Sequence, residues 1–257
     1  MKILALPFLA LLFGSCAASE TATRPANLNQ EVTPQTKALQ LVNSNGNITI
    51  TGLTAGNNIN VDADFFAHAS SIEKAQALVD DIQIEWSYTS GNAILIEITG
   101  VADNCGADLL LQVPEDFNID IRSTNGNVDV VPLVKGINVR TVNGNIVINS
   151  HDKVRAKTSN GNIVYQGNSR DFDLRTVNGN IKVAQSALFD GAGALTSVNG
   201  SLSVRNSATI DAKIIGETTN GSYGIYGPDL FEDQGAGLIR LETANGSISI
   251  THAEMLK

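Results

Sequence analysis

The dipeptide Asn-Gly occurs eight times in the 257-residue chain, and the residues around it repeat with it. The asparagines of these dipeptides are Asn45, Asn125, Asn143, Asn160, Asn178, Asn199, Asn220 and Asn245. From the second onward, the steps between them are 18, 17, 18, 21, 21 and 25 residues. Self-similarity at a short period is the signature of repeat architectures, so the chain is expected to fold as an array of similar units.

Apolar residues recur six and four positions before each Asn, and three and five positions after it. In one repeat, built around Asn143, these residues are Ile137, Val139, Ile146 and Ile148. Across the 32 positions of the four columns, only Gly193 and Gly216 are not apolar. A period of two on both sides of the dipeptide predicts strand, turn and strand with one buried face. Asn and Gly tolerate the left-handed backbone that a sharp turn requires.

Two all-β folds fit this pattern. In an antiparallel meander, each Asn-Gly is a separate hairpin turn, and its residues need not match those of the other turns. In a single-stranded β-solenoid, each repeat is one coil, and identical residues stack about 4.7–4.9 Å apart. The repetition of one residue at one place favours a solenoid of seven to eight short coils over residues 119–252. The predicted structural turn ladder is Asn125, Asn143, Asn160, Asn178, Asn199, Asn220 and Asn245.

Residues 37–118 are expected to form strands and a helix-bearing segment that cap the N-terminal end of the array. The run Ser70–Glu73 fits a helix capping box, and an apolar helical stripe follows it. The stripe consists of Ile72, Ala75, Leu78 and Val79. Strand-like runs cover 58–64, 81–88 and 93–99, whereas no comparable cap follows Ile250.

The first residues of the chain predict export and a lipid anchor. Lys2 and the apolar run Ile3–Phe13 form a signal peptide over residues 1–15, too short to span a bilayer. Leu12–Cys16 resembles a bacterial lipobox, in which Cys16 becomes the acylated N-terminus; an ordinary signal peptide is the alternative. Since Ala17 replaces the Asp of an inner-membrane retention signal, we expect a cell-envelope location in the outer membrane. Residues 16–36 are expected to form a flexible tether.

Composition and charge exclude several classes of function. A net charge of −9 and a pI near 4.7 argue against a general nucleic-acid binder. Three His and two Cys leave little material for a metal site or a disulfide framework, and no cofactor is expected. Cys105 is expected to be a buried small hydrophobe. The widely separated His68, His151 and His252 are expected on the surface.

One outward-facing column carries charge in successive repeats. Three positions before the Asn stand Arg122, Arg140, Lys157 and Arg175. In a stacked array these cations would form a candidate anion-binding strip for phosphate or carboxylate groups. The alternative is a solvated strand face that Asp120 and Asp173 neutralise locally.

No catalytic motif is present, so a non-enzymatic protein is expected. The alternative is a polysaccharide-active lyase or hydrolase on a β-helix. Hydrolysis would require two carboxylates about 5–9.5 Å apart. Asp120, Asp129 and Asp173 occupy outward strand positions but form no repeated cluster.

The chain resembles the bacterial "putative adhesin" domain family of cell-envelope proteins over about residues 37–252. The resemblance rests on the Asn45-Gly46 repeat, the strand Leu109–Glu115 ending in Val-Pro, and the repeat Val139–Ile146. It implies a β-solenoid and an envelope location, and it brings no catalytic or binding residues. The expected function is therefore an adhesin-like or scaffold surface for anionic envelope glycans or a protein partner. A structural component that binds another chain by strand addition at its exposed end is a further possibility.

Overall fold

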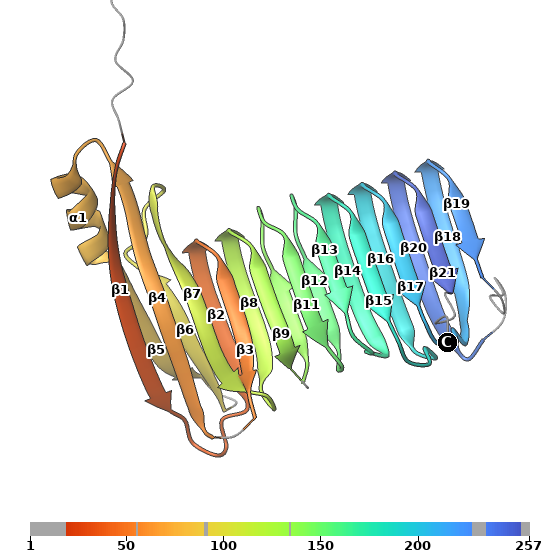
Figure 1. Ribbon diagram of the computed structural model, residues 1–257, viewed down its shortest axis with the longest axis horizontal. Helices are drawn as coiled ribbons and strands as arrows, with labels where there is room; N and C mark the ends of the chain where they lie inside the picture. Colours follow the sequence, from red (N-terminus) through yellow and green to blue (C-terminus); the bar gives the residue numbers. More distant parts are fainter. Residues whose placement is uncertain (1–18, 55, 90–91, 134, 228–234, 253–257) are drawn as a thin grey trace, which may run out of the picture.

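The computed structural model describes residues 19–54, 56–89, 92–133, 135–227 and 235–252. These residues form two large sheets and one helix, which confirms the prediction of an all-β fold. The strands of both sheets succeed one another along the long axis of the molecule (Figure 1).

Sheet A has eleven strands and sheet B has ten. In spatial order, sheet A consists of β1 (Glu20–Glu31), β4 (Asn58–Ala69), β7 (Cys105–Pro114), β3 (Ile48–Leu53), β9 (Val128–Leu133), β11 (Ile146–Ser150), β13 (Ile163–Gln166), β15 (Ile181–Gln185), β17 (Leu202–Asn206), β21 (Ile248–His252) and β19 (Tyr223–Tyr226). Sheet B consists of β18 (Ala212–Asn220), β20 (Gly237–Asn245), β16 (Ala192–Asn199), β14 (Asp171–Asn178), β12 (Val154–Lys157), β10 (Ile137–Arg140), β8 (Asn118–Asn125), β2 (Ala38–Asn45), β6 (Ala93–Thr99) and β5 (Gln83–Thr89).

Each Asn-Gly repeat gives its first strand to sheet B and its second strand to sheet A; we call these two strands a rung. Neighbouring rungs pair in parallel and without a register shift at the repeated positions. Ile137 pairs with Val154 in sheet B, and Ile146 pairs with Ile163 in sheet A. Because hairpin neighbours would pair antiparallel, this arrangement excludes the meander.

The four apolar columns form the core between the sheets. Val139, Ile146 and Ile148 are fully buried. The two glycines that interrupt the columns leave room for a ring. A Cβ on Gly193 would lie 2.4 Å from the Phe172 ring, and one on Gly216 would lie 2.3 Å from the Tyr223 ring. An aromatic side chain therefore fills each position where the aliphatic residue is missing.

The order of the rungs departs from the order of the chain at both ends. The rung of Asn45 lies directly against that of Asn125, because β2 pairs with β8 and β3 with β9. The intervening segment adds strands beyond it. At the other end, β20 and β21 lie between the rung of Asn199 and that of Asn220. The last repeat of the chain is thus intercalated, and the rung of Asn220 is outermost.

The N-terminal end carries the helix α1 (Ile72–Asp81) beside β1 and β4 (Figure 1). Its N-cap is Ser71, whose side chain accepts a hydrogen bond from the Lys74 N–H at 3.4 Å, so the predicted capping box is displaced by one residue. Ala75 and Val79 are buried as expected, whereas Ile72 is 47% exposed and lies outside the apolar stripe. The three expected strand segments form β4, β5 and β6.

The prediction of a flexible tether is wrong for Glu20–Glu31, which forms β1 and pairs antiparallel with β4. The strand is anchored by its few inward contacts. Ala22 is buried, and the Arg24 guanidinium lies 4.4 Å from the centre of the Phe65 ring. Pro25 is tolerated because β1 is an edge strand.

The predicted signal peptide and Cys16 lie outside the described residues. No helix in the described part of the chain is long and apolar enough to cross a membrane.

Candidate anion-binding groove

The turn asparagines form a continuous ladder at the corner of the array. The Asn143 Nδ2 donates to the Asn125 Oδ1 at 2.8 Å, and the Asn160 Nδ2 donates to the Asn143 Oδ1 at the same distance. The remaining hydrogen bonds run from Asn125 to Asn45, Asn178 to Asn160, Asn199 to Asn178, Asn245 to Asn199 and Asn220 to Asn245. All of the amides point the same way, toward the N-terminal rungs.

A second ladder runs two residues further along each turn. The Asn127 Oδ1 accepts the Asn145 backbone N–H at 2.9 Å, and the Asn145 Oδ1 accepts the Asn162 N–H at 2.9 Å. At the N-terminal end the ladder stops at Asp108, whose carboxylate accepts the Asn47 N–H at 2.6 Å. These corners hold the strands in register, and that register aligns the outward side chains of sheet B.

The structure brings all four predicted cations together on the outer face of sheet B. Arg140 pairs with Arg122 on one side and with Lys157 on the other, and Lys157 pairs with Arg175. Strands within a sheet lie about 4.7–4.9 Å apart, so each cation is one strand spacing from the next. We call these four residues the cation row.

Nearby aspartates neutralise the cation row only in part. Arg175 forms a bidentate pair with Asp173, at 2.7 and 2.8 Å, and this hydrogen bonding raises the pKa of the Arg175 guanidinium. Arg122 and Arg140 lie 3.7 and 3.9 Å from Asp120, too far for strong hydrogen bonds. Within the described residues, Lys157 has no carboxylate within ion-pair distance.

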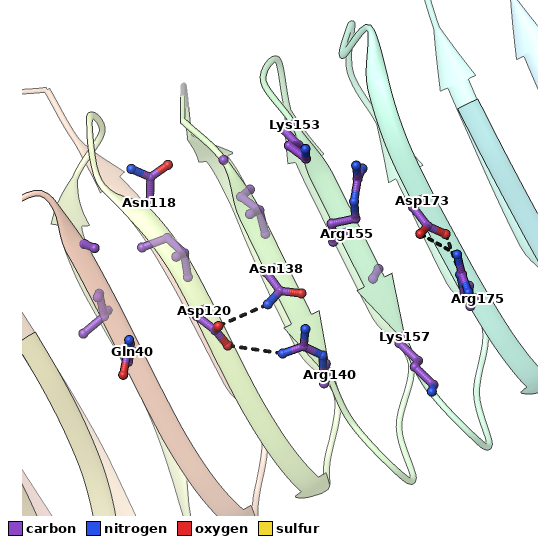
Figure 2. Close-up of a pocket in the computed structure, with 16 residues that line it drawn as sticks. Gln40, Asn118, Asp120, Asn138, Arg140, Lys153, Arg155, Lys157, Asp173 and Arg175 are labelled. Atoms are coloured by element: carbon purple, nitrogen blue, oxygen red, sulfur yellow. Dashed lines mark hydrogen bonds and ion pairs between the residues drawn. The ribbon is translucent and has the colours of Figure 1, made fainter. Parts of the chain in front are cut away.

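A groove of about 690 Å³ lies over β2, β8, β10, β12 and β14 (Figure 2). Its charged lining residues are Arg140, Lys153, Arg155, Lys157, Arg175, Asp120 and Asp173, and Arg122 continues the cation row beside the groove, next to Arg140. Five cations and two carboxylates give this surface a net charge of +3, in a chain whose formal charge is −9. The groove is therefore a local region of positive potential on an acidic protein.

Lys153 and Arg155 were not predicted as site residues from the sequence. Both lie on the same strand face as Lys157, at even spacing before it, which is the signal that could have identified them. Lys153 and Arg155 reach across to Asp171 at 3.1 and 2.8 Å. The Arg155 hydrogen bond, and to a smaller extent Lys153, hold the pKa of the Asp171 carboxyl below its usual range.

The other candidate residues do not assemble into a site. His68 forms a hydrogen bond with Thr21 at 2.8 Å, and the described residues hold no cluster of three His, Cys, Asp or Glu that could bind a metal. Cys105 is buried, and its Sγ accepts the Ala102 N–H at 2.9 Å.

The carboxylates considered for an enzyme lie apart. Asp120 is on β8 and Asp173 is on β14, with β10 and β12 between them, a separation of about 14 Å. Asp129 is on β9 of the other sheet. Paired carboxylates for glycoside hydrolysis stand no more than about 9.5 Å apart, so these three do not form such a pair.

No known family and no curated protein matches the sequence. Solved structures resemble the fold over most of its length. A "putative adhesin" from Bacteroides fragilis is 14% identical, with a TM-score of 0.49, and covers 88% of this chain and 97% of its own. A "putative adhesin" from Parabacteroides merdae is 8% identical, with a TM-score of 0.45, and the match covers 90% of this chain and 96% of that protein. A "putative lipid binding protein" from Parabacteroides distasonis is 12% identical, with a TM-score of 0.39, and the match covers 90% of this chain and 97% of that protein. The functional argument therefore rests on the groove.

Proposed function

We propose that this chain is a non-enzymatic cell-envelope lipoprotein whose repeats form a β-solenoid scaffold. Its adhesin-like surface is the groove on sheet B, which binds anionic groups of envelope glycans or of a protein partner. The observation that carries the proposal is the cation row, four cations in register on adjacent strands of an acidic protein.

The scaffold supports this proposal because it fixes the backbone positions of the cations before any ligand arrives. Each cation of the row stands on a strand, and its rung is held to its neighbours by backbone pairing and by the turn ladders. Sites built on strands are more precise than sites built on loops. The planar guanidinium groups of Arg140 and Arg122 match the geometry of carboxylate and phosphate.

Binding of anions is tested by comparing two double variants that change the net charge equally. Arg140→Ser with Lys157→Ser removes two cations from the groove. Lys182→Ser with Arg205→Ser removes two exposed cations from the outer face of sheet A. We expect the groove variant to bind anionic envelope glycans roughly tenfold more weakly than the native protein, because each exposed ion pair contributes about 0.2–1 kcal/mol.

The sheet A variant is expected to bind like the native protein. Equal losses in the two variants would show that only the overall charge matters, and unchanged binding in both would rule out the groove. Binding should also weaken as salt is added, since the contacts are exposed.

The lipid anchor is tested by metabolic labelling with a radiolabelled fatty acid. The native chain and Cys105→Ala are expected to incorporate label, because the Cys105 thiol is buried. Cys16→Ala is expected to incorporate none. Label retained in Cys16→Ala would refute anchoring at this residue.

A further inference from the structure

We infer that the groove binds a linear acidic polysaccharide with one carboxylate on each sugar, lying along the stack of rungs. This inference rests on the proposed anion-binding function and names the ligand class of the same site. It follows from the chemistry of two parallel rows of side chains, of which the cation row is only one.

The second row stands two positions before the cation row on each strand, and Figure 2 shows it beside three members of the cation row, Arg140, Lys157 and Arg175. Its members are Gln40, Asp120, Asn138, Arg155 and Asp173. We call it the acceptor row, because four of the five side chains carry an amide or carboxylate oxygen. A ligand that lies in the groove meets cations along one edge and hydrogen-bond acceptors along the other.

Asp120 offers the ligand a carboxylate oxygen with spare hydrogen-bonding capacity. Its Oδ2 accepts from the Asn138 Nδ2 at 3.1 Å, while its Oδ1 is shielded from solvent and accepts no hydrogen bond. The exposed guanidinium groups of Arg122 and Arg140 stand over this oxygen at 3.7 and 3.9 Å. When these side chains turn toward a ligand carboxylate, the Oδ1 opens to a hydroxyl donor on the same ligand.

The acceptor row separates acidic sugars from phosphate polymers. A uronic acid has a carboxylate and several hydroxyl donors on one ring, so it can satisfy both rows. A polyphosphate has anionic oxygens and no hydroxyl donors, so it leaves the Asp120 Oδ1 without a donor and is repelled by the carboxylates of Asp120 and Asp173. The two aspartates in an otherwise cationic groove therefore favour a hydroxyl-rich anion.

The shape of the groove favours a polymer over a single sugar. None of the described residues that line the groove is aromatic, so none of them offers a ring platform for one sugar. The cation row spans three strand spacings, about 14 Å. A sugar ring in an extended linear chain advances by nearly one strand spacing. Carboxylates of the chain that face the sheet can therefore reach cations at several points between β8 and β14.

Calorimetric titration of the purified full-length protein with oligogalacturonates of two to six sugars tests this inference. We expect affinity to rise roughly two- to fivefold with each sugar up to four, where the cation row ends, and then to level off. Fully methyl-esterified oligogalacturonate, which keeps its hydroxyls but loses its charge, is expected to bind at least about tenfold more weakly. Linear polyphosphate of similar length is expected to bind more weakly than the tetragalacturonate.

A double variant in the acceptor row tests whether the ligand is an acidic sugar. Asp120→Ala with Asp173→Ala removes two acceptors and frees the neighbouring arginines. It is expected to weaken tetragalacturonate binding and to strengthen polyphosphate binding. Asp129→Ala, on the other sheet, should leave both affinities unchanged.

The outcomes separate this inference from the function on which it rests. If polyphosphate binds the native protein as tightly as tetragalacturonate, the acidic-sugar class is wrong while anion binding by the groove stands. If neither ligand binds, the inference and the proposed function both fail.

Discussion

At the scale of single residues, the turn glycines explain why the repeat is Asn-Gly and not Asn followed by any small residue. A Cβ on Gly126 would lie 2.0 Å from the Gly46 carbonyl oxygen, and one on Gly144 would lie 1.9 Å from the Gly126 oxygen. The backbones of neighbouring rungs approach each other too closely for a side chain. The same closeness permits the asparagine ladders to form.

Gly126→Ala is expected to destabilise the protein by at least about 3 kcal/mol, because it combines a clash with the neighbouring rung and an unfavourable φ of +133°. Gly56→Ala is the matched control. Its φ is +108°, but nothing lies within 4 Å of the added Cβ, so only about 1 kcal/mol is expected. Urea unfolding of both variants measures the difference; equal losses would mean that backbone strain alone selects glycine.

At the scale of strands, the sequence predicted the buried faces well and the edges poorly. The columns around Asn143 alternate because both of its strands have one face in the core. The polar segment Glu20–Glu31 gave no such pattern, because an edge strand needs only a few buried contacts such as Ala22. Arg140 was predicted because the same position is cationic in neighbouring repeats. Lys153 and Arg155 occupy positions that are not cationic in the neighbouring repeats, so they were not predicted.

The pairing of β12 with β14 through Asp171 predicts a pH dependence. The pKa of this carboxyl is lowered in the folded state, so its ionised form stabilises the fold above the ordinary carboxyl pKa of about 3.9. That contribution is lost as the pH falls through the lowered pKa. We expect the native protein to be more stable than Asp171→Asn above about pH 4 and the two unfolding curves to converge below it. A gap that does not change with pH would contradict this prediction.

The intercalated position of β20 and β21 predicts their protection from hydrogen exchange. Both have neighbours on two sides, since β20 pairs with β16 and β18, and β21 pairs with β17 and β19. We expect the amides of β20 and β21 to exchange at least about tenfold more slowly than those of the outermost β18 and β19. The flanking β16 and β17 should match β20 and β21. Fastest exchange in the last repeat would contradict the rung order.

At the scale of the whole molecule, repetition makes the architecture predictable and the order of its parts unpredictable. All Asn-Gly repeats share the same apolar columns apart from Gly193 and Gly216, so their rungs are similar enough to pair in more than one order. The sequence therefore gave no reason to place the Asn245 rung before the Asn220 rung, or the Asn45 rung against the Asn125 rung. Those neighbours depend on the connecting segments, which lie outside the repeated pattern.

Deleting residues 144–160 is expected to leave a folded protein that is shorter by one rung. The deletion joins Asn143 to Gly161, so the turn is preserved, and β10 and β13 become one rung. Because each rung contacts only its neighbours, we expect the Tm to fall by less than about 10 °C. Anion binding should fall strongly, since Lys153, Arg155 and Lys157 are removed.

The control for this deletion removes residues 144–152, which takes out the whole of β11 and leaves its partner strand β10 as half a rung. It is expected to abolish the cooperative thermal transition seen by circular dichroism. If both deletions unfold the protein, the rungs are not interchangeable units.

The intercalated position of the Asn245 repeat also constrains the order in which the rungs can fold. A chain that emerges from a ribosome or a translocation pore presents its N-terminal segments first, and most rungs here can dock in the order in which they appear. The Asn220 repeat cannot do so, because its final neighbour is made after it. This repeat must wait undocked, or dock provisionally and be displaced, until residues 237–252 have emerged. Completion of this end of the array therefore waits for the emergence of residues 237–252.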